Sequence, residues 1–141
     1  MRALIDTNVL LDLFFEREPF VNEAKLIWEA NRSGHFEGWI APITPINIFY
    51  IGRKTKGRDA MHQALAALLA THQVCKLDAE VLNAALQLDC ADFEDAVQIA
   101  CSQAEELDAI ITRDQNHFTA LSMSVYTPTE FLTLLADERD L

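Results

Sequence analysis

Short aliphatic runs alternate along the chain with longer segments whose apolar residues recur every three or four positions. The short runs predict strands at residues 2–6, 38–42, 74–77, 109–112 and 124–126. A chain that alternates strands with helices in this way is typical of an α/β domain. We therefore expect a mainly parallel central sheet of about five strands.

The longer segments predict the helices that connect these strands. Helical spacing covers residues 9–15, 20–32, 46–54, 60–71, 78–88, 92–107 and 129–135. Gly34 ends the second helix, Gly57 separates the third from the fourth, and Pro128 introduces the last. The chain has no linker or repeat, so residues 1–141 are expected to form a single domain, with residues 136–141 as a frayed acidic tail.

Composition favours a folded domain outside membranes. Half of the 141 residues are apolar, which argues against a disordered chain. No apolar run approaches the roughly 20 residues of a membrane span, and the N-terminus lacks the features of a signal peptide, so we expect a cytoplasmic protein. Cys75, Cys90 and Cys101 are odd in number and lack zinc-site spacing, so we expect three small buried apolar residues.

Four aspartates stand where an open parallel sheet places its chemistry. Asp6 ends the first predicted strand, and Asp114 lies two residues beyond the fourth. Asp92 and Asp95 are three residues apart at the start of a helix, so both project from one side of its first turn. Ligands of such sheets bind outside the carboxyl ends of the strands, where these carboxylates would converge. An oxygen-only cluster favours Mg²⁺ or Mn²⁺, and these cations support phosphoryl chemistry.

The same aspartates also have structural interpretations. Asp6 and Asp92 are suited to capping the N-termini of the helices that follow them. Asp114 is a common type of turn residue. A lone carboxylate at any of these positions would therefore not establish a site.

Short polar side chains accompany the candidate ligands and leave two interpretations open. They either orient a carboxylate or a bound water, or they form ordinary turns and caps. The residues in question are Thr7, Asn8, Asn47 and Thr112.

Charge is distributed unevenly along the chain. The net charge of −11 argues against a broadly basic nucleic-acid-binding surface. Nevertheless, four of the eleven basic residues fall in one six-residue window, at Arg53, Lys54, Lys56 and Arg58. This basic window either contacts a phosphate backbone or is a solvated loop between helices.

Five segments in order resemble the PIN-domain family, and specifically its bacterial branch related to VapC-type toxins. The segments are "LIDTNVLLDLFFERE", "ITPINIFYIGRK", "DFEDAVQIACSQ", "DAIITRDQNHF" and "VYTPTEFL". The resemblance extends from residue 2 to about residue 132. It implies a three-layer α/β/α domain and a metal-dependent ribonuclease, often neutralised by an antitoxin.

The resemblance also assigns roles to individual residues. It implies that Asp6, Asp95 and Asp114 hold Mg²⁺ or Mn²⁺ while RNA is hydrolysed, with the basic window along the RNA backbone. The mid-chain acid of many PIN domains, commonly Glu, aligns with Asn47, so one negative charge is lost here. Asp92 is a candidate to restore that charge. The resemblance further suggests that Asn47, Thr112 or Asn8 positions the attacking water.

Two other functions remain to be distinguished from an RNA-cutting toxin. A phosphoacceptor receiver domain would need an acidic pair at the first strand and a Lys before the late proline, whereas Thr7 follows Asp6 and Thr127 precedes Pro128. A PIN-like domain that binds RNA or a protein partner without cutting is compatible with Asn47. Apolar helix faces such as "ALAALLA" fit either a homodimer or core packing.

Overall fold

A single parallel sheet forms the centre of the computed structural model, which describes residues 1–118 and 123–139. Within these residues the sheet has five strands in the order β3-β2-β1-β4-β5, and every neighbouring pair is parallel. The strands are β1 (Arg2–Ile5), β2 (Glu37–Ile40), β3 (Gln73–Val74), β4 (Ala109–Ile111) and β5 (Ser124–Tyr126). The chain runs outward from β1 on one side and then returns to β4 on the other. The strand order therefore reverses between β1 and β4.

Helices connect the strands and cover both faces of the sheet. In the described part of the chain there are seven: α1 (Thr7–Phe14), α2 (Val21–Arg32), α3 (Ile43–Gly52), α4 (Arg58–Thr71), α5 (Ala79–Leu86), α6 (Phe93–Ala104) and α7 (Pro128–Arg139). A short 3-10 helix, η1 (Gln115–Phe118), follows β4.

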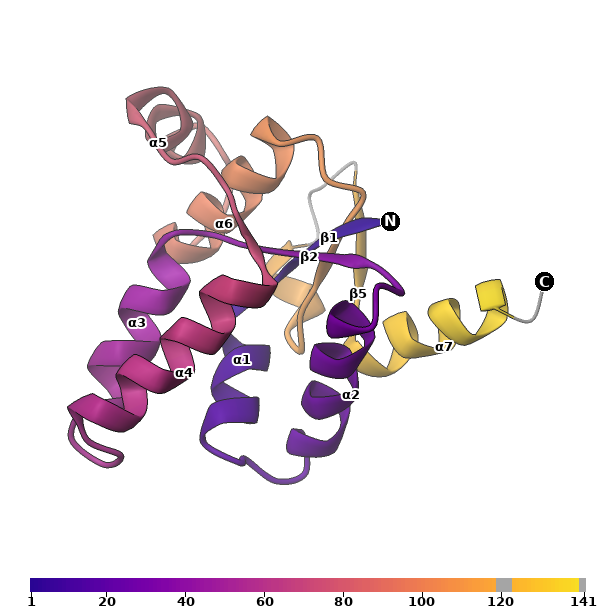
Figure 1. Ribbon diagram of the computed structural model, residues 1–141. Coiled ribbons are helices and arrows are strands. Elements are labelled where there is room, and N and C mark those ends of the chain that lie inside the picture. Colours follow the sequence, from indigo (N-terminus) through magenta and orange to yellow (C-terminus); the bar gives the residue numbers. More distant parts are fainter. Residues whose placement is uncertain (119–122, 140–141) are drawn as a thin grey trace.

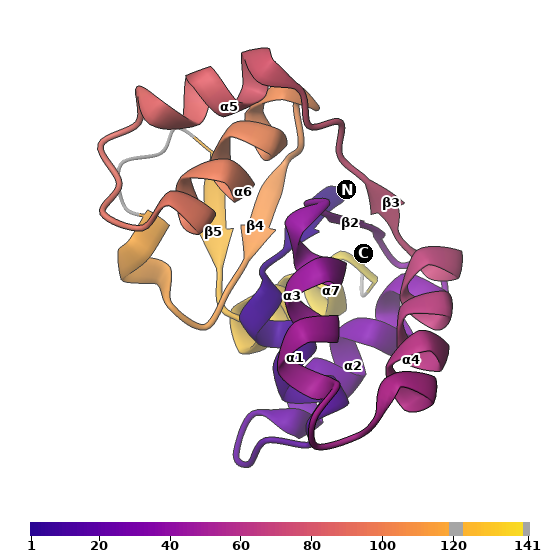
Figure 2. The same ribbon diagram turned by 90° about the vertical axis from the view of Figure 1, so that its left-hand side faces the viewer.

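Alternate residues of the central strand face two separate hydrophobic cores. Ala3 and Ile5 pack with residues of α1, α2, α4 and α7, whereas Leu4 packs with residues of α5 and α6. Figures 1 and 2 show α5 and α6 on one side of the sheet and α1, α2, α4 and α7 on the other. This arrangement confirms the three-layer α/β/α fold, with a sheet that is wholly parallel among the described strands.

The predicted elements all occur, and the largest boundary differences have local causes. Helix α3 begins at Ile43, three residues before the predicted start, because Pro45 lies in its first turn, where a missing N–H costs nothing. Strand β3 is only Gln73–Val74, not residues 74–77. Both of its residues are exposed at the edge of the sheet, so burial does not extend the strand.

The remaining sequence expectations concern the tail and the cysteines. Helix α7 continues through residue 139, so the predicted tail overlaps the end of this helix at residues 136–139, and residues 140–141 lie outside the described part. Cys75 and Cys101 are buried as expected, whereas Cys90 is partly exposed. Among residues 1–118 and 123–139, no helix combines the length and apolar character needed to cross a membrane.

Candidate active site

Carboxylates from separate parts of the chain line one pocket at the carboxyl edge of the sheet. The pocket has a volume of about 230 Å³. Asp6 reaches it from the end of β1, Asp95 from the first turn of α6, and Asp114 from the segment after β4. The other polar lining residues are Thr7, Asn8, Asn47, Asp92, Glu94 and His117. The strand order reverses here, which is where an open α/β sheet forms its ligand site.

Asp6 is held by neutral hydrogen-bond donors on both carboxylate oxygens. The hydroxyl of Thr112 donates to Oδ2 at 2.6 Å, and Nε2 of Gln98 donates to Oδ1 at 2.9 Å. Asp6 occupies the N-cap position of α1, but its side chain makes no capping hydrogen bond. Burial raises the pKa of Asp6, since the side chain is almost wholly enclosed, although both hydrogen bonds oppose the rise.

Asp95 lies between a second carboxylate and an imidazole. Asp92 caps α6, because its Oδ1 accepts from the backbone N–H of Asp95 at 3.1 Å. Oδ2 of Asp95 lies 3.1 Å from Nδ1 of His117, and the Asp95 side chain is only 15% exposed. Burial, together with the nearby charges of Asp6 and Asp92, raises the pKa of Asp95 to about 6, and His117 opposes this rise.

Asp114 is oriented by two residues singled out from the sequence. Its backbone N–H donates to the Thr112 hydroxyl at 3.0 Å, and Nδ2 of Asn8 donates to its Oδ2 at 2.9 Å. The other end of the Asn8 amide, Oδ1, is buried and has no hydrogen-bond partner among the described residues. Thr112 therefore connects Asp6 to the backbone of Asp114, and Asn8 holds the Asp114 carboxylate.

The structure places the remaining predicted residues in different surroundings. Thr7 borders the pocket, but its hydroxyl pairs with that of Thr44 at 2.8 Å and not with an acid. Of its two interpretations, the structure therefore gives no support to the orientation of a carboxylate. Asn47 lines the pocket from the first turns of α3 and is partly exposed.

The basic window does not line this pocket. All four residues are exposed: Arg53 caps the C-terminus of α3, Lys54 and Lys56 lie in the connection to α4, and Arg58 begins α4. Arg53, at the C-cap of α3, lies six residues beyond Asn47, which is roughly 9 Å along the helix axis.

The sequence analysis does not predict three side-chain contacts of this region. Gln98 is the amide in the otherwise apolar stretch that follows Asp95, a signal that was available. Asp12 was a carboxylate within an apolar helix, and it pairs with Arg113 at 2.6 Å. The contact of His117 with Asp95 had no sequence signal beyond the closeness of His117 to Asp114.

The donor set of the pocket consists of oxygens apart from His117. Across the residues that the structure describes, no three His, Cys, Asp or Glu side chains are grouped closely enough to hold a metal ion. The chemistry of the donors nevertheless fits a hard divalent cation, and the unpartnered Oδ1 of Asn8 is a further oxygen of the same kind.

Comparison with known proteins agrees with this architecture. The family model of the PIN domain matches residues 2–116, and no curated protein matches the chain. A toxin–antitoxin complex from Klebsiella pneumoniae is similar with a TM-score of 0.67 and 25% identity, covering 89% of this chain and 97% of that chain.

Two more distant structures share the fold. VapC20 of Mycobacterium tuberculosis, a toxin that cleaves the sarcin–ricin loop, gives a TM-score of 0.68 at 17% identity, covering 84% of this chain and 94% of that chain. DNA-bound VapBC of Salmonella typhimurium gives 0.69 at 13% identity, covering 91% and 98%. The family match leaves no support for a receiver domain. With its matched segment covering most of its length, the chain belongs to the PIN domain family.

Proposed function

We propose that this protein is a metal-dependent endoribonuclease that hydrolyses RNA phosphodiester bonds and acts as the toxin of a toxin–antitoxin pair. The observation that carries the proposal is the convergence of Asp6, Asp95 and Asp114, from three separate segments, on one pocket. Carboxylates this close repel one another, so a cation between them would relieve the repulsion. A structural role for each acid would not require them to meet.

Mg²⁺ or Mn²⁺ is the cofactor that this donor set suits. Asp6, Asp95 and Asp114 would hold it, with Asp92 and Asn47 as further oxygen donors at the rim. When bound, such a cation lowers the pKa of water and stabilises negative charge on a phosphodiester. Asn47 supplies an oxygen without a charge, so Asp92 is the candidate replacement for the usual mid-chain acid.

The remaining residues would orient the ligands and the RNA. Thr112 and Gln98 fix the Asp6 carboxylate, and Asn8 fixes that of Asp114. The amide of Asn47, which lines the same pocket, would orient an incoming water. The basic window at the end of α3 would hold the RNA backbone away from the acids, since phosphate contacts position a nucleic acid without reading its sequence.

An antitoxin is the protein partner that the similar structures favour. The Klebsiella pneumoniae structure is a toxin–antitoxin complex, and this chain spans nearly all of the matched chain. A homodimer is a further part of the proposal, supported by exposed apolar side chains on α3 such as Ile46 and Tyr50. Size-exclusion chromatography with light scattering measures this state, and a strictly monomeric protein would contradict it.

The nuclease proposal is tested with a panel of structured RNAs in Mn²⁺, Mg²⁺ or EDTA. We expect cleavage that needs the metal and that is lost in Asp6→Asn and Asp95→Asn. Asp78→Asn is a matched control, because Asp78 caps α5 as Asp92 caps α6 but lies outside the pocket. Cleavage indifferent to EDTA and to both substitutions would contradict the proposal. No Mn²⁺ binding by calorimetry would favour a non-catalytic domain that binds RNA or a protein.

A further inference from the structure

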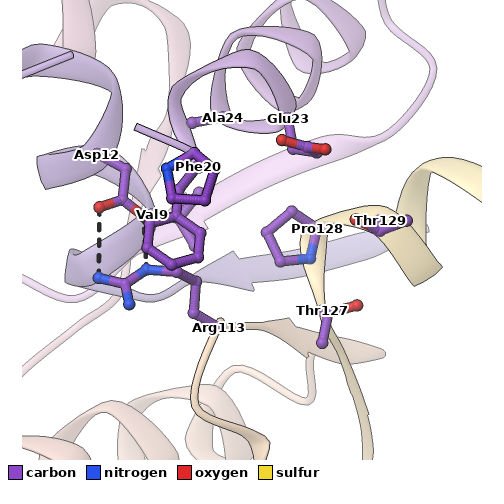
Figure 3. Close-up of a pocket in the computed structure, with 10 residues that line it drawn as sticks. Val9, Asp12, Phe20, Glu23, Ala24, Arg113, Thr127, Pro128 and Thr129 are labelled. Atoms are coloured by element: carbon purple, nitrogen blue, oxygen red, sulfur yellow. Dashed lines mark hydrogen bonds and ion pairs between the residues drawn. The ribbon is translucent and has the colours of Figure 1, made fainter. Parts of the chain in front are cut away.

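We propose that a second cavity, beside the acidic pocket, binds an unpaired nucleobase of the RNA; this inference rests on the proposed ribonuclease function. The cavity lies between α1, α2 and the start of α7 and has a volume of about 370 Å³. This volume falls within the range of small-molecule sites, near its lower end. Figure 3 shows the side chains that surround it.

Flat apolar surfaces dominate the walls of this cavity. Phe20, Pro19 and Pro128 line it together with Val9 and Ala24. The Phe20 side chain is 39% exposed although it is large and apolar. Unpaired bases pack on aromatic rings and on guanidinium planes, so the walls match the faces of a base.

Polar groups at the cavity match the edge of a base and not a phosphate. Arg113 is the cavity's one cationic side chain, and its guanidinium lies 4.2 Å from the Phe20 ring centroid. Two carboxylates, Asp12 and Glu23, also line the cavity, and Asp12 already pairs with Arg113. The lining therefore carries a net negative charge, which disfavours an anion. A neutral base can still donate hydrogen bonds to Glu23 or to the hydroxyls of Thr127 and Thr129.

Two short segments join the cavity to the acidic pocket. Arg113 lies between Thr112 and Asp114 in sequence, and both neighbours take part in the acidic site. On α1, Asn8 donates to Asp114, and Asp12 accepts from Arg113 four residues later. A strand of RNA whose phosphate lies at the acids therefore passes this cavity with a neighbouring nucleotide. Because α1 and the segment after β4 each contribute lining residues to both sites, this placement favours RNA over a protein side chain as the occupant.

The test measures binding without cleavage. A short fluorescein-labelled single-stranded RNA is titrated in EDTA by fluorescence anisotropy, together with versions that carry an abasic site at each position in turn. We expect Phe20→Ala to weaken binding by about 5- to 150-fold and Phe20→Tyr to stay within about two-fold of the wild type. Leu26→Ala, an exposed truncation on the same helix, should have no effect.

The decisive result is the combination of the two changes. One abasic position should reproduce the loss, and Phe20→Ala should cause no further loss with that RNA. If the losses of affinity from Phe20→Ala and from the abasic position add, the base site is refuted. It is also refuted if Phe20→Ala leaves the affinity for RNA unchanged but weakens binding of the cognate antitoxin. Phe20→Leu, which removes the flat ring but keeps an apolar side chain, keeps the test available if Phe20→Ala does not fold.

Failure of the base site and failure of the nuclease are separable. Metal-dependent cleavage with no contribution from Phe20 would refute the base site and leave the nuclease intact. Base-dependent binding without cleavage in Mn²⁺ would refute the nuclease and support an RNA-binding domain that retains the cavity.

Discussion

Two buried aspartates, one at the N-cap of α1 and one within this helix, have opposite electrostatic surroundings. Asp12 is 1% exposed and forms a two-pronged ion pair with Arg113, at 2.6 and 3.3 Å. Asp6 is 5% exposed, and the side chains that donate hydrogen bonds to it, those of Thr112 and Gln98, are both neutral. Its charged neighbours are acids. The charge of Asp12 is therefore compensated within the protein, whereas that of Asp6 is left for a ligand.

The difference distinguishes a carboxylate that is paired within the protein from one that we propose as a metal ligand. Burial raises the pKa of both side chains, and the charge of Asp114 adds to the rise at both. The Arg113 cation opposes the rise at Asp12, whereas neutral hydrogen-bond donors oppose it at Asp6. A buried acid that no cation balances is costly to ionise, and the proposed metal would remove this cost at Asp6. The following changes test this distinction.

The largest expected effect is the loss of activity in Asp6→Asn. We expect kcat/KM for RNA cleavage to fall by about 100-fold or more, because a charged metal ligand is lost. Stability in EDTA should stay close to that of the wild type, since the amide oxygen accepts from Gln98 and the amide N–H group donates to Thr112. Cleavage assays and thermal unfolding in EDTA measure the two effects. A marked fall in the Tm of Asp6→Asn in EDTA would instead show that Asp6 has a structural role.

Asp12→Asn should show the reverse pattern. Removing one partner leaves the Arg113 guanidinium without its counter-ion, which should lower the free energy of unfolding by about 3 kcal/mol and Tm by roughly 10 °C. Metal affinity should change little. The double variant Asp12→Leu, Arg113→Met removes both charges and should recover part of the loss. If Asp12→Asn unfolds at the wild-type temperature, the ion pair is not what stabilises this end of α1.

Two buried threonines extend the comparison from charges to hydrogen bonds. Thr112→Val removes the hydroxyl that donates to Asp6 and accepts from Asp114, so activity should fall by about 10- to 100-fold. Thr112→Ser should retain it. Thr44→Val is the matched control, because Thr44 is equally buried but bonds only Thr7, and it should cost about 1 kcal/mol of stability with no loss of activity. Equal losses of activity in the two variants would show that Thr112 has no specific role.

The acids could be located from the sequence because their positions depend on where the strands of a parallel sheet end. Asp6 and Asp114 follow neighbouring strands, and parallel strands bring their carboxyl ends to one edge. Asp92 illustrates that two interpretations can both hold, since it caps α6 and also lines the pocket. The capping argument alone could not have decided its role.

Side-chain partners were harder to predict because they depend on helix rotation and on distant pairing. Thr7 and Asn8 are adjacent on a helix, so their side chains diverge by about 100°, and only Asn8 reaches an acid. Asp12 and Arg113 are 101 residues apart, and no local pattern joins them. The start of α3 was placed late because Pro45 suggests a boundary unless the first turn is considered.

The smallest expected effect is a pH dependence of the free energy of unfolding, caused by the raised pKa of Asp95. The pKa of Asp95 is about 6 in the folded protein and 3.8 in the reference state, so the folded chain binds more protons between these values. Stability of the metal-free protein should therefore fall as pH rises from about 4 to about 6, by roughly 1–2 kcal/mol after screening by solvent. Asp95→Asn should flatten this slope, and Asp78→Asn should not.

Because Mn²⁺ binds the ionised carboxylate of Asp95, it should stabilise the wild type most above pH 6. The Tm in Mn²⁺ minus the Tm in EDTA should therefore increase between about pH 4 and pH 6. A difference that is independent of pH would mean that the bound cation does not contact Asp95.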